Sequence, residues 1–182
     1  MSDLTLAGLC GSLRAGSYNR TLMTEAARRF APARFDDIDL RFPLFDDDIQ
    51  QGPGIPDEVQ KAAAQIVAAD AVIVVTPEYN KGISGVLKNA LDWLSRVDTK
   101  PWAGKPVAIL SATAGRSGGE RAQNMTRLCL SPFRPVLLTG PEVLVGGVAQ
   151  QFDDGGALTN ERYAAAVDAQ MAELRRIAKL LG

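Results

Sequence analysis

The sequence predicts an α/β fold in which a five-stranded parallel sheet of order 2-1-3-4-5 carries helices on both faces, as a three-layer sandwich. Strand-like and helix-like segments alternate along the 182 residues. The run Ala71–Thr76, Ala-Val-Ile-Val-Val-Thr, is typical of a central parallel strand that is buried on both faces. A loop of small residues follows the first strand and precedes a helix, and this arrangement favours the stated strand order.

Local signals mark the expected elements in chain order. The first helix should end before Pro32, and Thr159 is expected to cap the last helix. Residues 43–56 are dense in Pro, Gly and Asp and are expected to form a loop, in which Asp46-Asp47-Asp48 is a solvated turn. The expected strands are residues 4–10, 35–42, 71–76, 105–112 and 136–145, the last bent near Gly140-Pro141. The expected helices are residues 19–30, 56–69, 84–96, 118–130 and 160–181.

Length and composition predict one globular domain, residues 1–182. The net charge is −1 and there is no basic tract, so nucleic acid is not an expected partner. The first residues, Met1 to Leu4, contain no basic region and lead into no cleavable apolar segment, so we expect no signal peptide. No apolar run is long enough to span a bilayer. We therefore expect a cytoplasmic protein without membrane insertion.

The available side chains restrict the chemistry. The chain has no histidine, which excludes Ser-His-Asp and Cys-His catalysis and removes the usual general base. Its two cysteines, Cys10 and Cys129, are expected to be small buried apolar residues, and no metal site is expected. If the protein is an enzyme, a cofactor is expected to carry the reaction, so no side chain is assigned a catalytic role.

The stretch from Gly8 to Arg20 joins the first strand to the first helix, as in the units that hold phosphate groups in open α/β sheets. It fits neither the Walker A loop nor the dinucleotide fingerprint, which favours a monophosphate; an ordinary Gly/Ser-rich turn is the alternative. Gly11 and Gly16 are expected to allow close backbone approach and unusual dihedral angles. The expected phosphate donors are helix-start amides and the side chains of Ser12, Arg14, Ser17 and Asn19.

Two further loops are expected at the same edge of the sheet. After Ala71–Thr76, Pro77 takes the chain out of the sheet, and Tyr79 and Asn80 should lie near the first loop. Tyr79 can cover the face of a ring, or it can simply pack against its neighbours. Residues 111–119 form a third loop, whose small side chains let a flat ring approach the backbone. A phosphate pocket beside a planar slot matches FMN better than ATP or a bare phosphate.

These blocks resemble the NADPH-dependent FMN reductase family of flavodoxin-like proteins, particularly its quinone and chromate reductase members. Residues 11–19, Gly-Ser-Leu-Arg-Ala-Gly-Ser-Tyr-Asn, are similar to the family's G-S-x-R-x-x-S-x-N phosphate signature. Residues 76–80 and 85–93 are similar to its P-E-Y-N and G-x-L-K-N-A-x-D-W blocks. Residues 111–119 match more weakly, and a further similarity at residues 152–159 extends the resemblance over almost the full length.

The resemblance implies a flavodoxin-like fold and assigns FMN contacts by position. At the phosphate, the matching residues are Ser12, Arg14, Ser17 and Asn19. Against the loop or the ribityl chain, the matching residue is Tyr18. Along the isoalloxazine ring, mainly through backbone groups, they are Pro77, Glu78, Tyr79 and Asn80. At the other edge of the ring, they are Ser111, Thr113 and Gly115.

By the same resemblance, NADPH or NADH passes a hydride to bound FMN, which then reduces a quinone or similar small acceptor in a ping-pong cycle. Family members are dimers or dimers of dimers, so a homodimer or homotetramer is implied. Two other functions stay open. An electron-carrier flavodoxin would share the fold, although the net charge of −1 and Arg14 argue against it. A non-enzymatic phosphate-binding module would share the first loop.

Overall fold

A computed structural model of the chain describes residues 4–182; Met1–Asp3, on which the expectation about a signal peptide partly rests, lie outside the described residues. The sheet has the order β2-β1-β3-β4-β5, with β6 also paired to β4, and every pairing is parallel. The predicted order is therefore confirmed. The strands are β1 Thr5–Cys10, β2 Arg34–Ile38, β3 Ala71–Thr76, β4 Pro106–Ala112, β5 Val136–Leu137 and β6 Val143–Val145.

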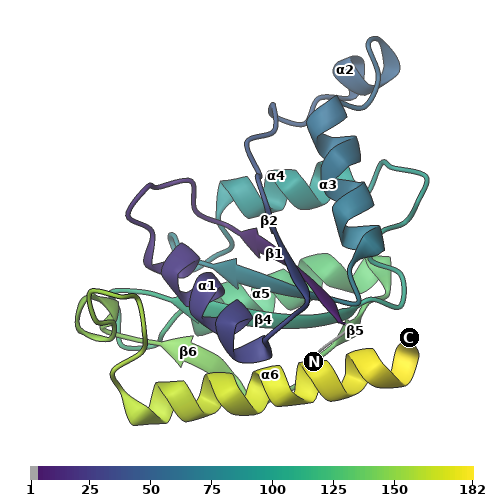
Figure 1. Cartoon of the computed structure of the whole chain (residues 1–182). Coiled ribbons are helices and arrows are strands. Elements are labelled where there is room, and N and C mark those ends of the chain that lie inside the picture. Colours follow the sequence, from purple (N-terminus) through teal and green to yellow (C-terminus); the bar gives the residue numbers. More distant parts are fainter. Residues whose placement is uncertain (1–3) are drawn as a thin grey trace.

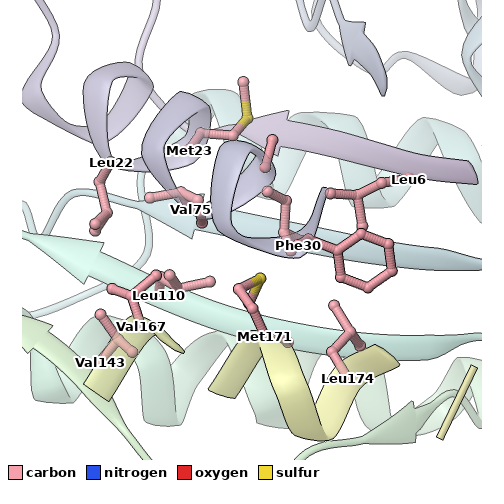
Figure 2. Packing of buried hydrophobic residues seen from close by; sticks show 14 of the residues in the cluster. Leu6, Leu22, Met23, Phe30, Val75, Leu110, Val143, Val167, Met171 and Leu174 are labelled. Carbon is pink, nitrogen blue, oxygen red and sulfur yellow. The ribbon is translucent and has the colours of Figure 1, made fainter. Parts of the chain in front are cut away.

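Helices cover both faces of the sheet (Figure 1). On one face, α1 and α6 pack on the sheet, and Figure 2 shows Phe30 of α1 and Met171 of α6 in the same cluster as Val75 of β3. On the other face lie α3, α4 and the end of α5, with Leu87 and Leu130 among the buried residues. The helices are α1 Tyr18–Phe30, α2 Asp47–Gln51, α3 Asp57–Ala68, α4 Gly85–Leu94, α5 Glu120–Leu130 and α6 Glu161–Leu181.

The central strands are buried throughout, as the sequence predicts. Every residue of β3 and β4 is buried. Alternate residues of β3 contribute to opposite cores, with Ile73 and Val75 on the α1–α6 side and Val72 and Val74 on the α3–α4 side. Full burial of each such side chain contributes about 2 kcal/mol. The sheet therefore gives a rigid base to the loops at the ends of β1, β3 and β4.

The predicted fifth strand is two short strands instead of one. β5 pairs with the beginning of β4, whereas β6 pairs with its last three residues, Leu110, Ser111 and Ala112. Between them the chain leaves the sheet around the cis bond Gly140–Pro141, where the sequence predicts a bend. Because proline has no backbone N–H, it cannot continue the ladder.

Several boundaries differ from those predicted. The expected solvated turn begins a short helix, α2, and the side chain of Asp46 caps it. Asn160, and not Thr159, caps α6, since its side chain accepts hydrogen bonds from two amides of the first turn. β2 is shorter than predicted. α5 begins at Glu120, because Gly118 and Gly119 adopt positive φ angles of 64° and 94° that a helix does not allow.

A buried carboxylate of α1 holds the arginine that joins α1 to α6. Glu25 is 3% exposed, and it accepts hydrogen bonds from Nε of Arg28 at 2.8 Å and Nε of Arg29 at 2.7 Å. Arg29 also pairs with Asp168 of α6 at 2.6 Å. Burial raises the pKa of Glu25, but the hydrogen bonds and charges of the two arginines outweigh it, so the pKa lies below its usual value. The ionised carboxylate therefore supports the α1–α6 contact indirectly, through Arg29.

Candidate functional site

The loops at the carboxyl ends of β1, β3 and β4 enclose a cavity of about 440 Å³, which is a usual size for a small-molecule site. Its position agrees with the switch point at which open α/β sheets bind ligands. A smaller cavity, of about 210 Å³, lies beside Trp102 and Phe133 and includes none of these loops. The predicted site residues that line the larger cavity are Ser12, Arg14, Ser17, Tyr18, Asn19, Pro77, Glu78, Tyr79, Thr113 and Gly115.

The first loop carries a row of backbone N–H groups without a protein acceptor among the described residues, and Ser12, Arg14, Ser17, Tyr18 and Asn19 of this row line the cavity. Within residues 4–182, none of the N–H groups from Ser12 to Asn19 donates to a protein acceptor. Ser12, Ser17 and Asn19 are nevertheless buried residues, and backbone N–H groups of buried residues usually have a partner. The row ends in the first turn of α1, where the helix dipole is positive. Such a row suits an anion, and above all a phosphate.

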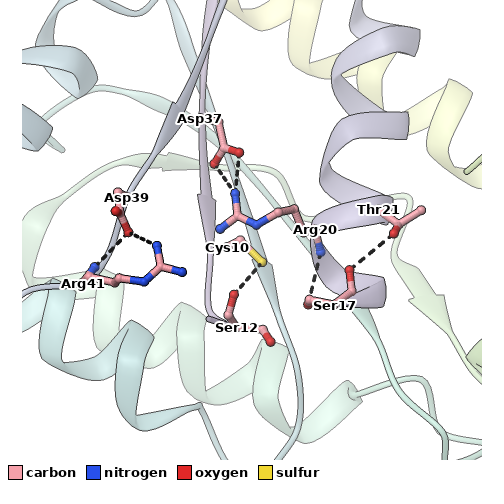
Figure 3. A network of polar contacts seen from close by, with 8 residues as sticks. All are labelled: Cys10, Ser12, Ser17, Arg20, Thr21, Asp37, Asp39 and Arg41. Atoms are coloured by element: carbon pink, nitrogen blue, oxygen red, sulfur yellow. Dashed lines mark hydrogen bonds and ion pairs between the residues drawn. The ribbon is translucent and has the colours of Figure 1, made fainter. Parts of the chain in front are cut away.

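Packing explains why this loop needs particular residues. A Cβ at Gly11 would lie 2.8 Å from Oγ of Ser84, so only glycine fits there. At Gly16, by contrast, a Cβ would meet nothing within 4 Å, and neither glycine has a positive φ, so the expected unusual dihedral angles are wrong. Ser17 caps α1, because its hydroxyl accepts from the backbone N–H of Arg20 at 3.4 Å (Figure 3).

Arg14 is the cationic side chain of the cavity. It forms no ion pair within the described part of the chain, and its guanidinium donates one hydrogen bond, to the carbonyl of Gly16 at 2.6 Å. Arg20, which lies nearby, is instead paired with Asp37 of β2 (Figure 3). The remaining N–H groups of Arg14 are thus available for a charge-assisted hydrogen bond to a ligand.

The side chain of Asn19 is bonded to the protein itself. Its Nδ2 donates to the carbonyl of Ala112 and its Oδ1 accepts from the N–H of the same residue, both at 2.9 Å. This pair ties the start of α1 to the end of β4, and Asn19 is only 5% exposed. Asn19 can therefore donate to a phosphate only through its backbone N–H or the second hydrogen of Nδ2.

The second loop is a tight turn at one wall of the cavity. Tyr79 and Gly82 exchange backbone hydrogen bonds of 3.2 and 3.0 Å, while Asn80 and Lys81 take positive φ angles of 49° and 65°. Tyr79 lines the cavity and remains 56% exposed. Asn80 does not line the cavity, so the structure does not support its predicted contact. The carboxylate of Glu78 is bonded to the first turn of α5.

The buried hydroxyl of Ser111 fixes the third loop on the side away from the cavity. Ser111 is 0% exposed, and its Oγ donates to the carbonyl of Gly118 at 2.6 Å and accepts from Nε2 of Gln123 at 2.9 Å. Ser111 therefore lies behind the wall, and the predicted contact through this residue is not supported. Thr113 and Gly115 do line the cavity, as predicted.

Sequence reasoning missed part of the wall. Val148 and Ala149 belong to a 3-10 turn, Val148–Gln150, that follows β6. This turn is fixed to the third loop, since the N–H of Val148 donates to the carbonyl of Thr113 at 3.1 Å. The pair Gly146-Gly147 after the last strand was the available signal. The lining residues that were not predicted are Ala112, Ala114, Ser117, Val148 and Ala149.

Comparisons with known proteins agree with this geometry. The family model for NADPH-dependent FMN reductase matches residues 4–150. An NAD(P)H-dependent FMN reductase of Pseudomonas aeruginosa is 39% identical over 175 residues, which cover 95% of this chain and 94% of that protein. A quinone reductase of Escherichia coli is 42% identical over 151 residues, which cover 81% of this chain and 79% of that protein.

Among solved structures, FerB, a flavoenzyme NAD(P)H:(acceptor) oxidoreductase from Paracoccus denitrificans, superposes with a TM-score of 0.88 at 28% identity, over 98% of this chain and 99% of its own. Sequence, strand order and cavity position thus agree. The chain belongs to the NADPH-dependent FMN reductase family and has its flavodoxin-like fold.

Proposed function

We propose that this protein is an oxidoreductase that transfers a hydride from NAD(P)H to FMN in the cavity and then reduces a quinone or similar small acceptor, in a ping-pong cycle. FMN supplies the redox chemistry that the side chains of this histidine-free chain lack. The observation that carries the proposal is that none of the N–H groups of the first-loop residues lining the cavity, Ser12, Arg14, Ser17, Tyr18 and Asn19, has an acceptor within residues 4–182. Relatives named quinone reductase and 2-hydroxy-1,4-benzoquinone reductase support the acceptor class.

The residues present fit both ends of FMN. A phosphate monoester needs several donors, and the row of N–H groups, the hydroxyls of Ser12 and Ser17 and the guanidinium of Arg14 supply them. A flat ring needs walls without bulky side chains. Ala114 and Gly115 line the cavity on the third loop, and neither has a side chain larger than a methyl group. The two ends lie in one continuous cavity, so one ligand can reach both.

The chain positions the reactants and stabilises charge. In the second loop, Glu78 lines the cavity, and its N–H group has no protein acceptor within residues 4–182. Such a fixed dipole favours the negative charge that develops on a ring during reduction. Tyr79, which is 56% exposed, leaves this wall open. NAD(P)H and the acceptor can therefore use the same opening in turn, as a ping-pong cycle requires.

We propose further that residues 1–182 form one domain, that the protein is cytoplasmic and that it is a homodimer or homotetramer. Met125 and Leu128 of α5 are 40% and 70% exposed, and Met125 packs against Gly82 and Ile83 of the second loop. Exposed apolar side chains beside a cavity suit a surface that a second copy covers. No helix in residues 4–182 is long and apolar enough to cross a membrane.

The test is an absorption spectrum of the purified protein with added FMN, followed by anaerobic addition of NADPH or NADH and then of benzoquinone. We expect a bound-flavin spectrum that bleaches with a reduced nicotinamide and returns with the quinone. Bound flavin that neither nicotinamide bleaches would refute the reductase and indicate an electron carrier. Absence of flavin binding would leave only a phosphate-binding module.

A matched pair of variants tests the phosphate end. Arg14→Ala should weaken FMN binding about tenfold or more, because it removes a charge-assisted hydrogen bond, and should leave riboflavin binding unchanged. Arg41→Ala is the control, since Arg41 pairs with Asp39 outside the cavity wall (Figure 3). Titration of flavin fluorescence measures both. Equal losses in the two variants, or an equal loss for riboflavin, would contradict this role of Arg14.

A further inference from the structure

Glu78 makes a contact that its position in the second loop does not by itself require. Its Oε2 accepts hydrogen bonds from the backbone N–H groups of Arg121 at 3.1 Å and Ala122 at 3.3 Å. These are the second and third residues of α5, whose N-terminal amides lack a partner within the helix. The residue at the N-cap of α5 is Gly119, which has no side chain to cap it. A carboxylate from another loop therefore performs the capping.

This cap joins two walls of the cavity. Glu78 follows β3, whereas α5 follows the third loop, at the end of β4, and both Glu78 and residues 113–115 line the cavity. Within residues 4–182, the other polar link between the second loop and this segment is the weak contact of Ile83 N with Sδ of Met125 at 3.4 Å. Beyond the paired ends of β3 and β4, Glu78 is thus the main polar link between the two walls within the described residues.

We propose that Glu78 is a positioning residue, which sets the width of the ring slot by capping α5 across the two loops. The inference rests on the proposed function, since the slot is the part of the cavity assigned to the flavin ring. Because the carboxylate is bonded to α5, the backbone N–H of Glu78, and not its side chain, is the group left for the ring.

Three variants separate this role from an ordinary loss of stability. Glu78→Ala removes the cap, and Glu78→Gln keeps a neutral acceptor of the same length. Asn160→Ala removes a matched cap, because Asn160 accepts from Arg162 N at 3.1 Å and Tyr163 N at 3.4 Å in the first turn of α6, and it is not a cavity residue. Hydrogen exchange at Arg121 and Ala122 reports directly whether the cap of α5 is present.

For Glu78→Ala we expect faster exchange at those two amides, a dissociation constant for FMN raised about fivefold to tenfold, which is the worth of one N-cap, and a higher KM for NAD(P)H. Glu78→Gln should restore most of each value. Asn160→Ala should lower the urea midpoint of the FMN-free protein, because it also removes one N-cap. It should leave FMN affinity within about twofold.

The inference is overturned if Glu78→Ala loses protection at α5 but binds FMN and NAD(P)H as the wild type does, or if Asn160→Ala weakens FMN equally. If Glu78→Ala does not fold, Glu78→Gln decides: faster exchange at the two amides with unchanged FMN affinity refutes the positioning role. A wild type that exchanges slowly at these amides but binds no FMN refutes the proposed function and leaves the cap itself intact.

Discussion

Replacing Asn19 by alanine tests whether this side chain holds the protein together or holds a ligand. The change removes two hydrogen bonds of 2.9 Å to Ala112. The N–H and carbonyl of Ala112, which is 2% exposed, are then left without those partners. Each loss costs about 1–2 kcal/mol, whereas the better helix propensity of alanine returns about 0.5 kcal/mol. The free energy of unfolding of the FMN-free protein should therefore fall by about 2–3 kcal/mol.

Urea unfolding of the FMN-free protein, followed by circular dichroism, measures this loss. With a slope of about 2 kcal/mol per molar urea, the midpoint should fall by about 1–1.5 M. Asn124→Ala is the control, because Asn124 is an exposed asparagine of α5, and its midpoint should not fall. An Asn19→Ala protein with an unchanged midpoint but weakened FMN binding would refute the reasoning, since the side chain would then serve the ligand.

Three further changes test the fold around the site. Because the pKa of Glu25 lies below the value of 4.5 that it has without these contacts, its contribution is full above that pH and is lost as the pH falls through the lower, folded-state value. The stability difference between the wild type and Glu25→Gln, from urea unfolding, should therefore shrink from about pH 6 to about pH 3, and a constant difference would contradict this. Burial raises the thiol pKa of both cysteines, so both should react slowly. Because Cys129 is half-buried and Cys10 fully buried, iodoacetamide should label Cys129 first, as mass spectrometry can show. Gly118→Ala would place a Cβ 2.4 Å from the backbone of β6 at a φ of 64° and should cost more than about 2 kcal/mol, whereas Gly16→Ala, in open space, should not lower the melting temperature.

The sheet could be predicted because its signals are local and strong. The continuous run of β3, the alternation of strand-like and helix-like segments and the small-residue loop after β1 are each readable within a few residues. The split of the last strand could not be read in this way. β5 and β6 meet opposite ends of β4, and only the folded sheet decides which residues between them leave the ladder. The choice of Asn160 over Thr159 as a cap is likewise settled by backbone geometry.

The position of the candidate site could also be predicted, but the partners of its polar side chains could not. The resemblance assigned Asn19 to the phosphate and Glu78 and Ser111 to the ring, the Glu78 contact mainly through backbone groups. In the structure their side chains bond instead to backbone groups of β4, α5 and the third loop. Each of these partners lies more than six residues away in the chain or on another element, so no local sequence pattern predicts the hydrogen bond.

These side-chain ties explain how a backbone can act as the recognition surface. Backbone N–H groups that have no protein acceptor do not hold their loop in place, so side-chain hydrogen bonds must do so. Asn19 anchors the first loop to β4, Glu78 anchors the second to α5, and Ser111 anchors the third to Gly118. The amides are thereby free for a ligand and still rigid. On this reasoning, substitutions at the three anchors should weaken flavin binding through loop order, whereas substitution of Arg14, whose one hydrogen bond to the protein is to Gly16 of the same loop, should weaken it mainly through the lost contact with the ligand.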